Sequence, residues 1–166
     1  MNFKVASLIA FIVSGFSIST NAAQYSPDQV KAVYLYRIAN FVRWDNETEM
    51  DRIRFCIHGN EAIRSTLEVI TKGKSIREMP IEVLTSDKNR CDVVFVSGEQ
   101  QIEFEQLNDH VLTISDTQGF TLDGGVIELQ TIQSKIKPFI NLDNAKDGGF
   151  SIGSQLLRIA TVEGKQ

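Results

Sequence analysis

The side chains best suited to chemistry in this 166-residue chain are two cysteines and two histidines. Cys56 and His58 are close neighbours in the sequence, whereas Cys91 and His110 come later. Thiolate and imidazole groups are common zinc ligands, but Cys-x-His is not a usual zinc spacing, and no Cys-x2-Cys or His-x3-His accompanies it. The two cysteines could instead form a disulfide bond or remain free thiols, and the compartment decides between these outcomes.

Other catalytic and cofactor-binding patterns are weak. The single glycine of His58-Gly59-Asn60-Glu61 does not make a dinucleotide-binding loop, and no Walker pattern is present. The carboxylate pairs Glu103/Glu105 and Asp143/Asp147 are expected to face solvent. We therefore predict no catalytic residue, no metal site and no cofactor, and we expect that the chain is not an enzyme.

The first 23 residues have the layout of a secretory signal peptide. Lys4 precedes an apolar run over residues 5–16, and small residues follow as far as Ala23. A spanning helix needs about 20 apolar residues, so a membrane anchor is the weaker alternative. We expect cleavage after Ala22 or Ala23, which leaves one exported domain over residues 24–166.

Export favours a disulfide between Cys56 and Cys91, because two cysteines in an oxidising compartment most often pair. Closing a loop of about 36 residues would stabilise the fold by roughly 4 kcal/mol in the chain-entropy model. A metal site and two unpaired thiols remain the alternatives at this point.

The charge balance argues against a nucleic-acid partner. The chain carries 17 Lys and Arg against 21 Asp and Glu, which gives a net charge of −4. Neutralisation of phosphates supplies much of the affinity for nucleic acid, and this acidic chain has no long basic run.

A long helix is predicted near the start of the exported domain. Ser26 and Pro27 form a typical helix start, and apolar residues at 3–4 spacing continue to about Trp44. So wide an apolar stripe indicates deep burial, or burial on one side and partner contact on the other. Our candidates for partner contact are Tyr36, Phe41 and Trp44, with Arg43 at the rim, while plain core packing is the alternative.

The middle of the chain alternates between strand and helix signals. Strands are predicted at 53–58, 81–84, 92–96 and 111–115, and helices at 61–70 and 99–107. In the last third, a hairpin over 126–140 has Pro138 in its second strand, which predicts that this strand lies at an edge or has a local interruption. A short helix after Asn141 and a final helix from Ser154 to Ala160 follow, and the final helix is expected to turn Leu156, Leu157, Ile159 and Ala160 toward the core. These signals predict a single α/β domain with a parallel-rich mixed sheet flanked by helices, in a Rossmann-like three-layer arrangement with a C-terminal hairpin and helix.

Several motifs together resemble one family, the YfiR-like family of small periplasmic proteins. They span about Val30 to Ala160. The segments that carry the resemblance are Lys31-Ala32-Val33-Tyr34-Leu35-Tyr36 with Phe41-Val42-x-Trp44, Leu112-Thr113-Ile114-Ser115-Asp116, Phe120 to Ile127, Phe139-Ile140-Asn141 with Ala145, and Gln155-Leu156-Leu157-Arg158-Ile159-Ala160. Cys56 and Cys91 also fall where the family has a strand cysteine and a cysteine that opens the next apolar strand.

The resemblance implies a role in the periplasm. The best-known member binds the periplasmic sensor domain of an inner-membrane diguanylate cyclase and represses it, and an OmpA-like outer-membrane lipoprotein relieves the repression. Members carry disulfides and can form homodimers. A similar role here would control cyclic di-GMP synthesis and biofilm formation. The alternative is a periplasmic protein that binds a small molecule or a cell-wall fragment, and a cleft of converging polar groups would favour it.

Overall fold

The computed structural model describes residues 25–85, 90–98, 107 and 110–164, which form one eight-stranded sheet, a small two-stranded sheet and four α-helices. The helices are α1 (Pro27–Phe41), α2 (Glu61–Thr71), α3 (Leu142–Asp147) and α4 (Ser154–Leu157), and η1 (Glu47–Glu49) is a 3-10 turn. The strands are β1 (Val42–Trp44), β2 (Ile53–His58), β3 (Ser75–Ile76), β4 (Met79–Leu84), β5 (Val93–Val96), β6 (Leu112–Ser115), β7 (Ile127–Ile132), β8 (Lys135–Asn141), β9 (Phe150–Ile152) and β10 (Thr161–Glu163).

The large sheet is mostly parallel, as predicted. Its strand order is β10-β8-β7-β6-β5-β2-β4-β3, and the neighbours β4, β2, β5, β6 and β7 all run in the same direction. The predicted hairpin is present as the antiparallel pair β7–β8. On the outer side of β8, β10 pairs only with Phe139–Asn141, so Pro138 lies beside an open edge where its missing N–H costs no ladder bond.

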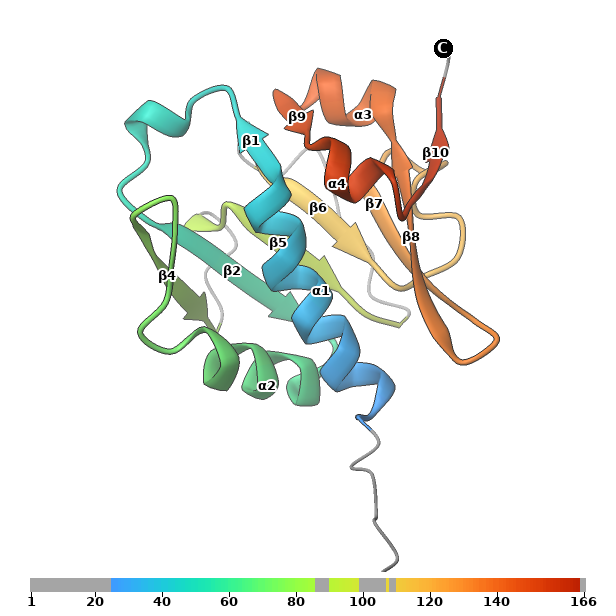
Figure 1. Ribbon diagram of the computed structural model, residues 1–166, viewed down its shortest axis with the longest axis horizontal. Helices are drawn as coiled ribbons and strands as arrows, with labels where there is room; N and C mark the ends of the chain where they lie inside the picture. Colours follow the sequence, from blue (N-terminus) through green and yellow to red (C-terminus); the bar gives the residue numbers. More distant parts are fainter. Residues whose placement is uncertain (1–24, 86–89, 99–106, 108–109, 165–166) are drawn as a thin grey trace, which may run out of the picture.

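The two faces of the sheet are covered differently. Figure 1 shows α1 crossing the sheet with α2 beside it, and these helices bury a large apolar cluster that includes Leu35, Phe55 and Phe95. Because side chains alternate along a strand, Cys56 and Val94 point to the opposite face, where a smaller cluster forms. The helices that flank the sheet are thus confirmed on one face. The helix predicted at 99–107, which would complete a third layer, lies outside the described residues except for Leu107.

The N-terminal helix begins as predicted and ends earlier. Ser26 and Gln29 form a reciprocal capping box, with the Gln29 N–H donating to Ser26 Oγ at 3.2 Å. The helix stops at Phe41 rather than near Trp44, because Val42 takes extended backbone and starts β1. β1 pairs with β9, more than a hundred residues away, in the register Val42↔Ile152. That long-range pairing overrides the local helical pattern.

The C-terminal helix is also shorter than predicted. α4 covers only Ser154–Leu157, and the chain then turns into β10, which adds a parallel strand beside β8. Leu156 is buried as expected, but Ile159 is 52% exposed, so the prediction that Ile159 faces the core is wrong. The run Ala160-Thr161-Val162 contains β-branched residues that suit a strand better than a helix end.

The predicted signal peptide, residues 1–23, lies outside the described residues. Among the residues that the structure does describe, no helix is long and apolar enough to cross a membrane.

Candidate functional site

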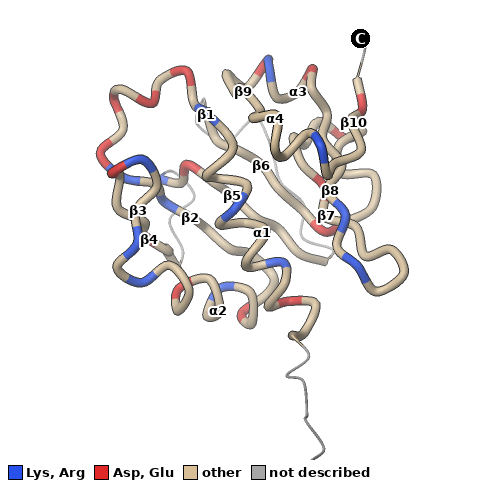
Figure 2. Tube along the Cα trace, in the orientation of Figure 1, with Lys and Arg blue, Asp and Glu red and all other residues tan. Residues whose placement is uncertain are grey.

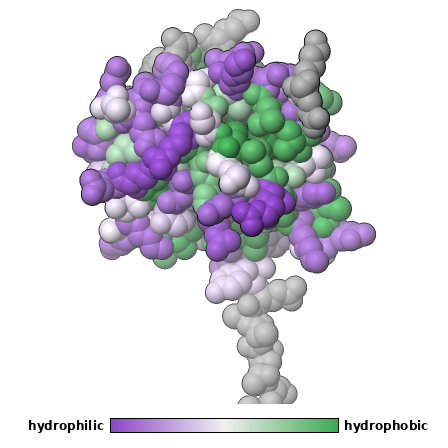
Figure 3. Space-filling view, turned by 45° about the horizontal axis from the view of Figure 1, so that its top comes forward, coloured by the Kyte–Doolittle hydropathy of each residue, from purple (hydrophilic) through white to green (hydrophobic). Residues whose placement is uncertain are grey.

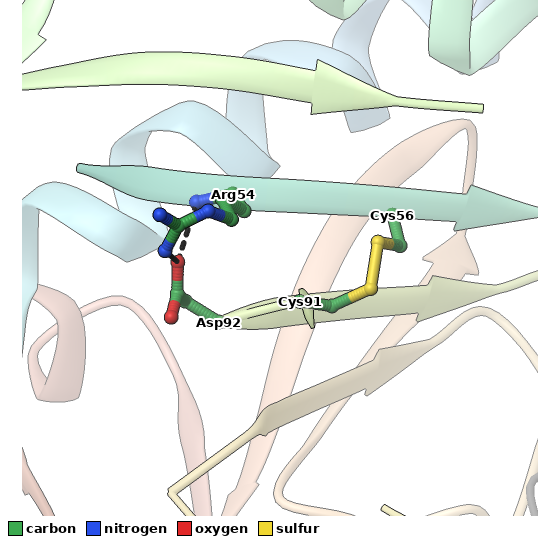
Figure 4. The surroundings of a disulfide bond; sticks show 4 residues. All are labelled: Arg54, Cys56, Cys91 and Asp92. Atoms are coloured by element: carbon green, nitrogen blue, oxygen red, sulfur yellow. Dashed lines mark hydrogen bonds and ion pairs between the residues drawn. A yellow bond between two sulfur atoms is a disulfide. The ribbon is translucent and has the colours of Figure 1, made fainter. Parts of the chain in front are cut away.

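Cys56 and Cys91 form a disulfide bond, which joins β2 to a position two residues before the start of β5. Both cysteines are buried, and their Cα atoms are 5.8 Å apart. Figure 4 shows the bond between two neighbouring strands. Because each sulfur is bonded to the other, the metal-site and free-thiol alternatives for these two residues are excluded.

An ion pair next to the disulfide ties the same two segments together. The backbone N–H of Arg54 donates to Asp92 Oδ2 at 2.7 Å, and the guanidinium Nη1 lies 3.6 Å from that oxygen (Figure 4). Burial raises the pKa of the Asp92 carboxyl above its usual range, and the hydrogen bond and charge of Arg54 offset only part of that effect. The disulfide and this pair are therefore one structural unit that fixes β5 against β2.

The four residues predicted for partner contact do not share one surface. Trp44 is only 3% exposed and packs edge to face on Phe150, with ring centroids 6.2 Å apart. Tyr36 and Phe41 are half-buried and, at about 100° per helical residue, point about 140° apart around α1. Arg43 is exposed on β1 and pairs with Glu47 at 3.0 Å. Partner binding by these residues stays a prediction, and the burial of Trp44 removes the exposed aromatic face on which we based it.

Arg77, which the sequence analysis did not single out, fixes the end of α1. Its guanidinium donates to Glu47 at 2.6 and 2.9 Å and to the carbonyls of Ala39, Asn40 and Val42 at 3.2–3.3 Å. It also lies 5.9 Å from the centroid of the Trp44 ring. Figure 2 shows the acidic residues of the loop after β1 close to basic residues near β3. Arg77 thus caps a helix end that has no basic residue in its own last turn.

The charge of Glu47 is favoured by this arrangement. Burial alone would raise the pKa of Glu47, but the hydrogen bonds and charges of Arg77 and Arg43 outweigh burial and lower the pKa below its usual value.

The Ser115-Asp116 motif at the end of β6 has a structural role. Asp116 Oδ2 lies 2.6 Å from Lys31 Nζ of α1 and accepts a hydrogen bond from Ser97 Oγ at 3.0 Å. Ser115 Oγ donates to the carbonyl of Val96 at 2.8 Å. These contacts join α1 to the carboxyl ends of β5 and β6, so the motif positions the helix and contributes no free reactive group.

Two serine patterns that the sequence analysis overlooked lack catalytic geometry. Gly149-Phe150-Ser151-Ile152-Gly153 matches Gly-x-Ser-x-Gly, but Ser151 lies inside β9 and is paired with Arg43 of β1. A nucleophile elbow requires a sharp turn from a strand into a helix at the serine itself. Ser134 and Lys137 match Ser-x-x-Lys, but Ser134 lies in the β7–β8 turn and Lys137 in the following strand.

An exposed apolar surface lies at the end of the chain, where the shortened α4 leads into β10. Ile159 is 52% exposed, Val162 is 42% exposed, and Leu157 is half-buried and packs against the core. We call these three residues the C-terminal apolar surface. Figure 3 shows a hydrophobic region on this side of the molecule, with hydrophilic residues around it. An apolar centre with a polar rim is typical of protein interfaces.

A separate pocket of about 400 Å³ lies at the amino end of β6 and β7. We call it the amino-edge pocket. Its wall contains apolar, amide, imidazole and carboxylate groups, contributed by Leu107, His110, Val111, Thr113, Gly124, Val126, Asn144, Asp147, Gly148 and Phe150. His110 Nδ1 lies 2.8 Å from Asp45 Oδ1. Asp147 is exposed, as predicted, and its place on the same pocket as His110 was not predicted, because the two are far apart in the chain.

Comparison with known proteins identifies the family. The family model described as YfiR/HmsC-like matches residues 28–161, which covers most of the chain and every element from α1 to the start of β10. A search of curated proteins returns no match.

Proposed function

Because the chain belongs to the YfiR/HmsC-like family, we propose that it is a periplasmic regulator that binds the sensor domain of an inner-membrane diguanylate cyclase. By binding the cyclase in its inactive state, it represses cyclic di-GMP synthesis and thereby limits biofilm formation. The family is regulatory, and its members act through partner proteins rather than by catalysis. The family match over residues 28–161 carries this proposal.

The C-terminal apolar surface is our candidate for the contact with the cyclase. Ile159 and Val162 offer exposed apolar side chains, and the adjoining Arg158 is exposed and charged. Of the residues predicted on the first helix, Phe41 is joined to the start of α4, because the N–H of Gly153 donates to the Phe41 carbonyl at 2.7 Å. Repression requires only a difference in affinity between two partner states, and a tenfold preference corresponds to about 1.4 kcal/mol.

The rest of the proposed role concerns compartment and partners. We propose that residues 1–23 are removed during export, after Ala22 or Ala23, and that the domain over residues 24–166 acts in the periplasm. The disulfide is consistent with an oxidising compartment. An OmpA-like outer-membrane lipoprotein would relieve repression by sequestering the regulator, and we also propose that the protein forms a homodimer.

A binding titration tests the proposed contact. The purified periplasmic domain of a candidate cyclase is titrated with the wild-type protein and with the variants Ile159→Glu and Val162→Glu. Since each variant places a charge in an apolar contact, we expect at least tenfold weaker binding. Val69→Glu is the matched control, because Val69 is 74% exposed on α2, outside the proposed surface. Equal affinities for all four proteins would reject the C-terminal apolar surface as the contact.

A further inference from the structure

We propose that the amino-edge pocket binds a small organic molecule that carries a protonated amine. This inference goes beyond the contact with a protein partner and does not depend on it. A volume of about 400 Å³ lies within the range of ligand pockets, which span roughly 300–1,000 Å³.

The apolar part of the wall is rigid. Phe150, Val111 and Val126 are buried and belong to the sheet or its immediate neighbours. Phe150 is fixed from one side by the Trp44 ring and from another by Gly148, where a side chain would collide with the Phe150 ring. A preformed apolar wall suits the hydrocarbon body of a ligand, since little ordering is needed on binding.

The polar part of the wall is held in place by hydrogen bonds. Asn144 donates both amide hydrogens, to the carbonyls of Thr121 at 3.0 Å and Gly125 at 2.7 Å, which fixes its side chain. Thr113 Oγ1 accepts the N–H of Val126 at 3.1 Å. These contacts tie Asn144 and Thr113 to the segment Phe120 to Ile127, which carries part of the family resemblance.

Two residues of the wall occupy positions that local physics disfavours. His110 has a left-handed backbone with φ 64°, which is uncommon outside glycine. Asp147 is the last residue of α3, where the free helix carbonyls repel a negative charge. Departures from local preference tend to gather at functional sites. Here both departures occur on one cavity, although the residues are 37 positions apart in the sequence.

The charges around the pocket select a cation. Asp147, which is exposed, contributes the carboxylate of the wall, whereas the Asp45 carboxylate lies outside the wall and is paired with His110 Nδ1 at 2.8 Å. Among the described residues of the wall there is no Lys or Arg, and Lys146 on the same helix is exposed and does not contribute to it. A ligand ammonium next to Asp147 would pair with its carboxylate, while the apolar body of the ligand packs against Phe150 and Val126.

The test uses two pairs of probes that differ only in the amine. Isotopically labelled protein over residues 24–166 is titrated with benzylamine and benzyl alcohol, and separately with glucosamine and glucose. Backbone amide resonances are followed by NMR. We expect shifts at Gly124 and Gly148 with at least one amine, and at least tenfold weaker binding of its neutral counterpart. The better amine tells whether the body of the ligand is aromatic or a sugar.

Substitutions test whether the Asp147 carboxylate binds the amine. Asp147→Asn should weaken binding of the amine at least tenfold, whereas Asp143→Asn, on the same helix but outside the pocket, should leave it unchanged. The proposal is overturned if neither amine binds at millimolar concentration, if the neutral probes bind equally well, or if the shifts lie elsewhere. These results are independent of the cyclase titration, so failure of either proposal leaves the other intact.

Discussion

The two faces of the large sheet are stabilised by different means. On the face covered by α1 and α2, buried side chains from helices and strands form one continuous apolar cluster around Phe55 and Phe95. On the opposite face, the described residues form a smaller cluster of Cys56, Cys91, Val94, Val96 and Val111. The disulfide belongs to this second face. The disulfide bond therefore lies on the face where, in the described part of the chain, fewer apolar side chains are buried.

Neighbouring residues of β5 give the sharpest test of this difference, because Phe95 and Val94 point to opposite faces. Phe95→Ala should destabilise the protein by about 3–5 kcal/mol, since it leaves a large cavity in the main core. Val94→Ala removes fewer atoms from a smaller cluster and should cost clearly less. Urea unfolding of both variants measures the free energies. Equal losses would show that the two faces contribute alike.

Removal of the disulfide should have the next largest effect. The double variant Cys56→Ala/Cys91→Ala should lose about 2–4 kcal/mol, because the unfolded chain regains the entropy of the open loop. Wild-type protein that is unfolded and then refolded in a reducing agent should lose the same amount of stability. The same treatment should leave the stability of the double variant unchanged. A stable wild type with free thiols under oxidising conditions would contradict the link itself, and mass measurement of the non-reduced protein checks this directly.

The smallest expected effect is a difference between Glu47 and Asp92 in how their contributions to stability depend on pH. Glu47 has a lowered pKa, so its contribution to stability is present above its unfolded pKa and is lost as pH falls through the folded value. Asp92 has a raised pKa, so its contribution is present below its unfolded pKa and is lost as pH rises through the folded value. The destabilisation caused by Glu47→Gln should therefore shrink on acidification. The free energy of unfolding of Asp92→Asn, relative to the wild type, should increase as pH rises. Chemical unfolding between pH 3 and 7 measures both, and parallel slopes would contradict the assignments.

Local patterns in the sequence were enough to predict most of the sheet. The strand predicted at 92–96 corresponds to β5, and the helix start predicted at Ser26 and Pro27 and the helix predicted at 61–70 correspond to α1 and α2. The short strands β1, β9 and β10 could not be predicted, because each exists only through pairing with a distant segment. Trp44 was assigned to a helix for the same reason.

The candidate sites were harder to predict than the fold. The disulfide followed from two cysteines and a predicted export signal. The C-terminal apolar surface was not predicted, because Ile159 was assigned to a helix that in the structure ends at Leu157. The amino-edge pocket brings His110 next to Asp45 and opposite α3, and no sequence spacing encodes that meeting.

The most direct test of the proposed function is the cyclic di-GMP content of cells that express a candidate diguanylate cyclase together with this protein. The account predicts that the wild type and Val69→Glu lower cyclic di-GMP several-fold, whereas Ile159→Glu, exported to the same level, does not. Unchanged cyclic di-GMP with the wild type for every cyclase encoded near its gene, or full repression by Ile159→Glu, would contradict it.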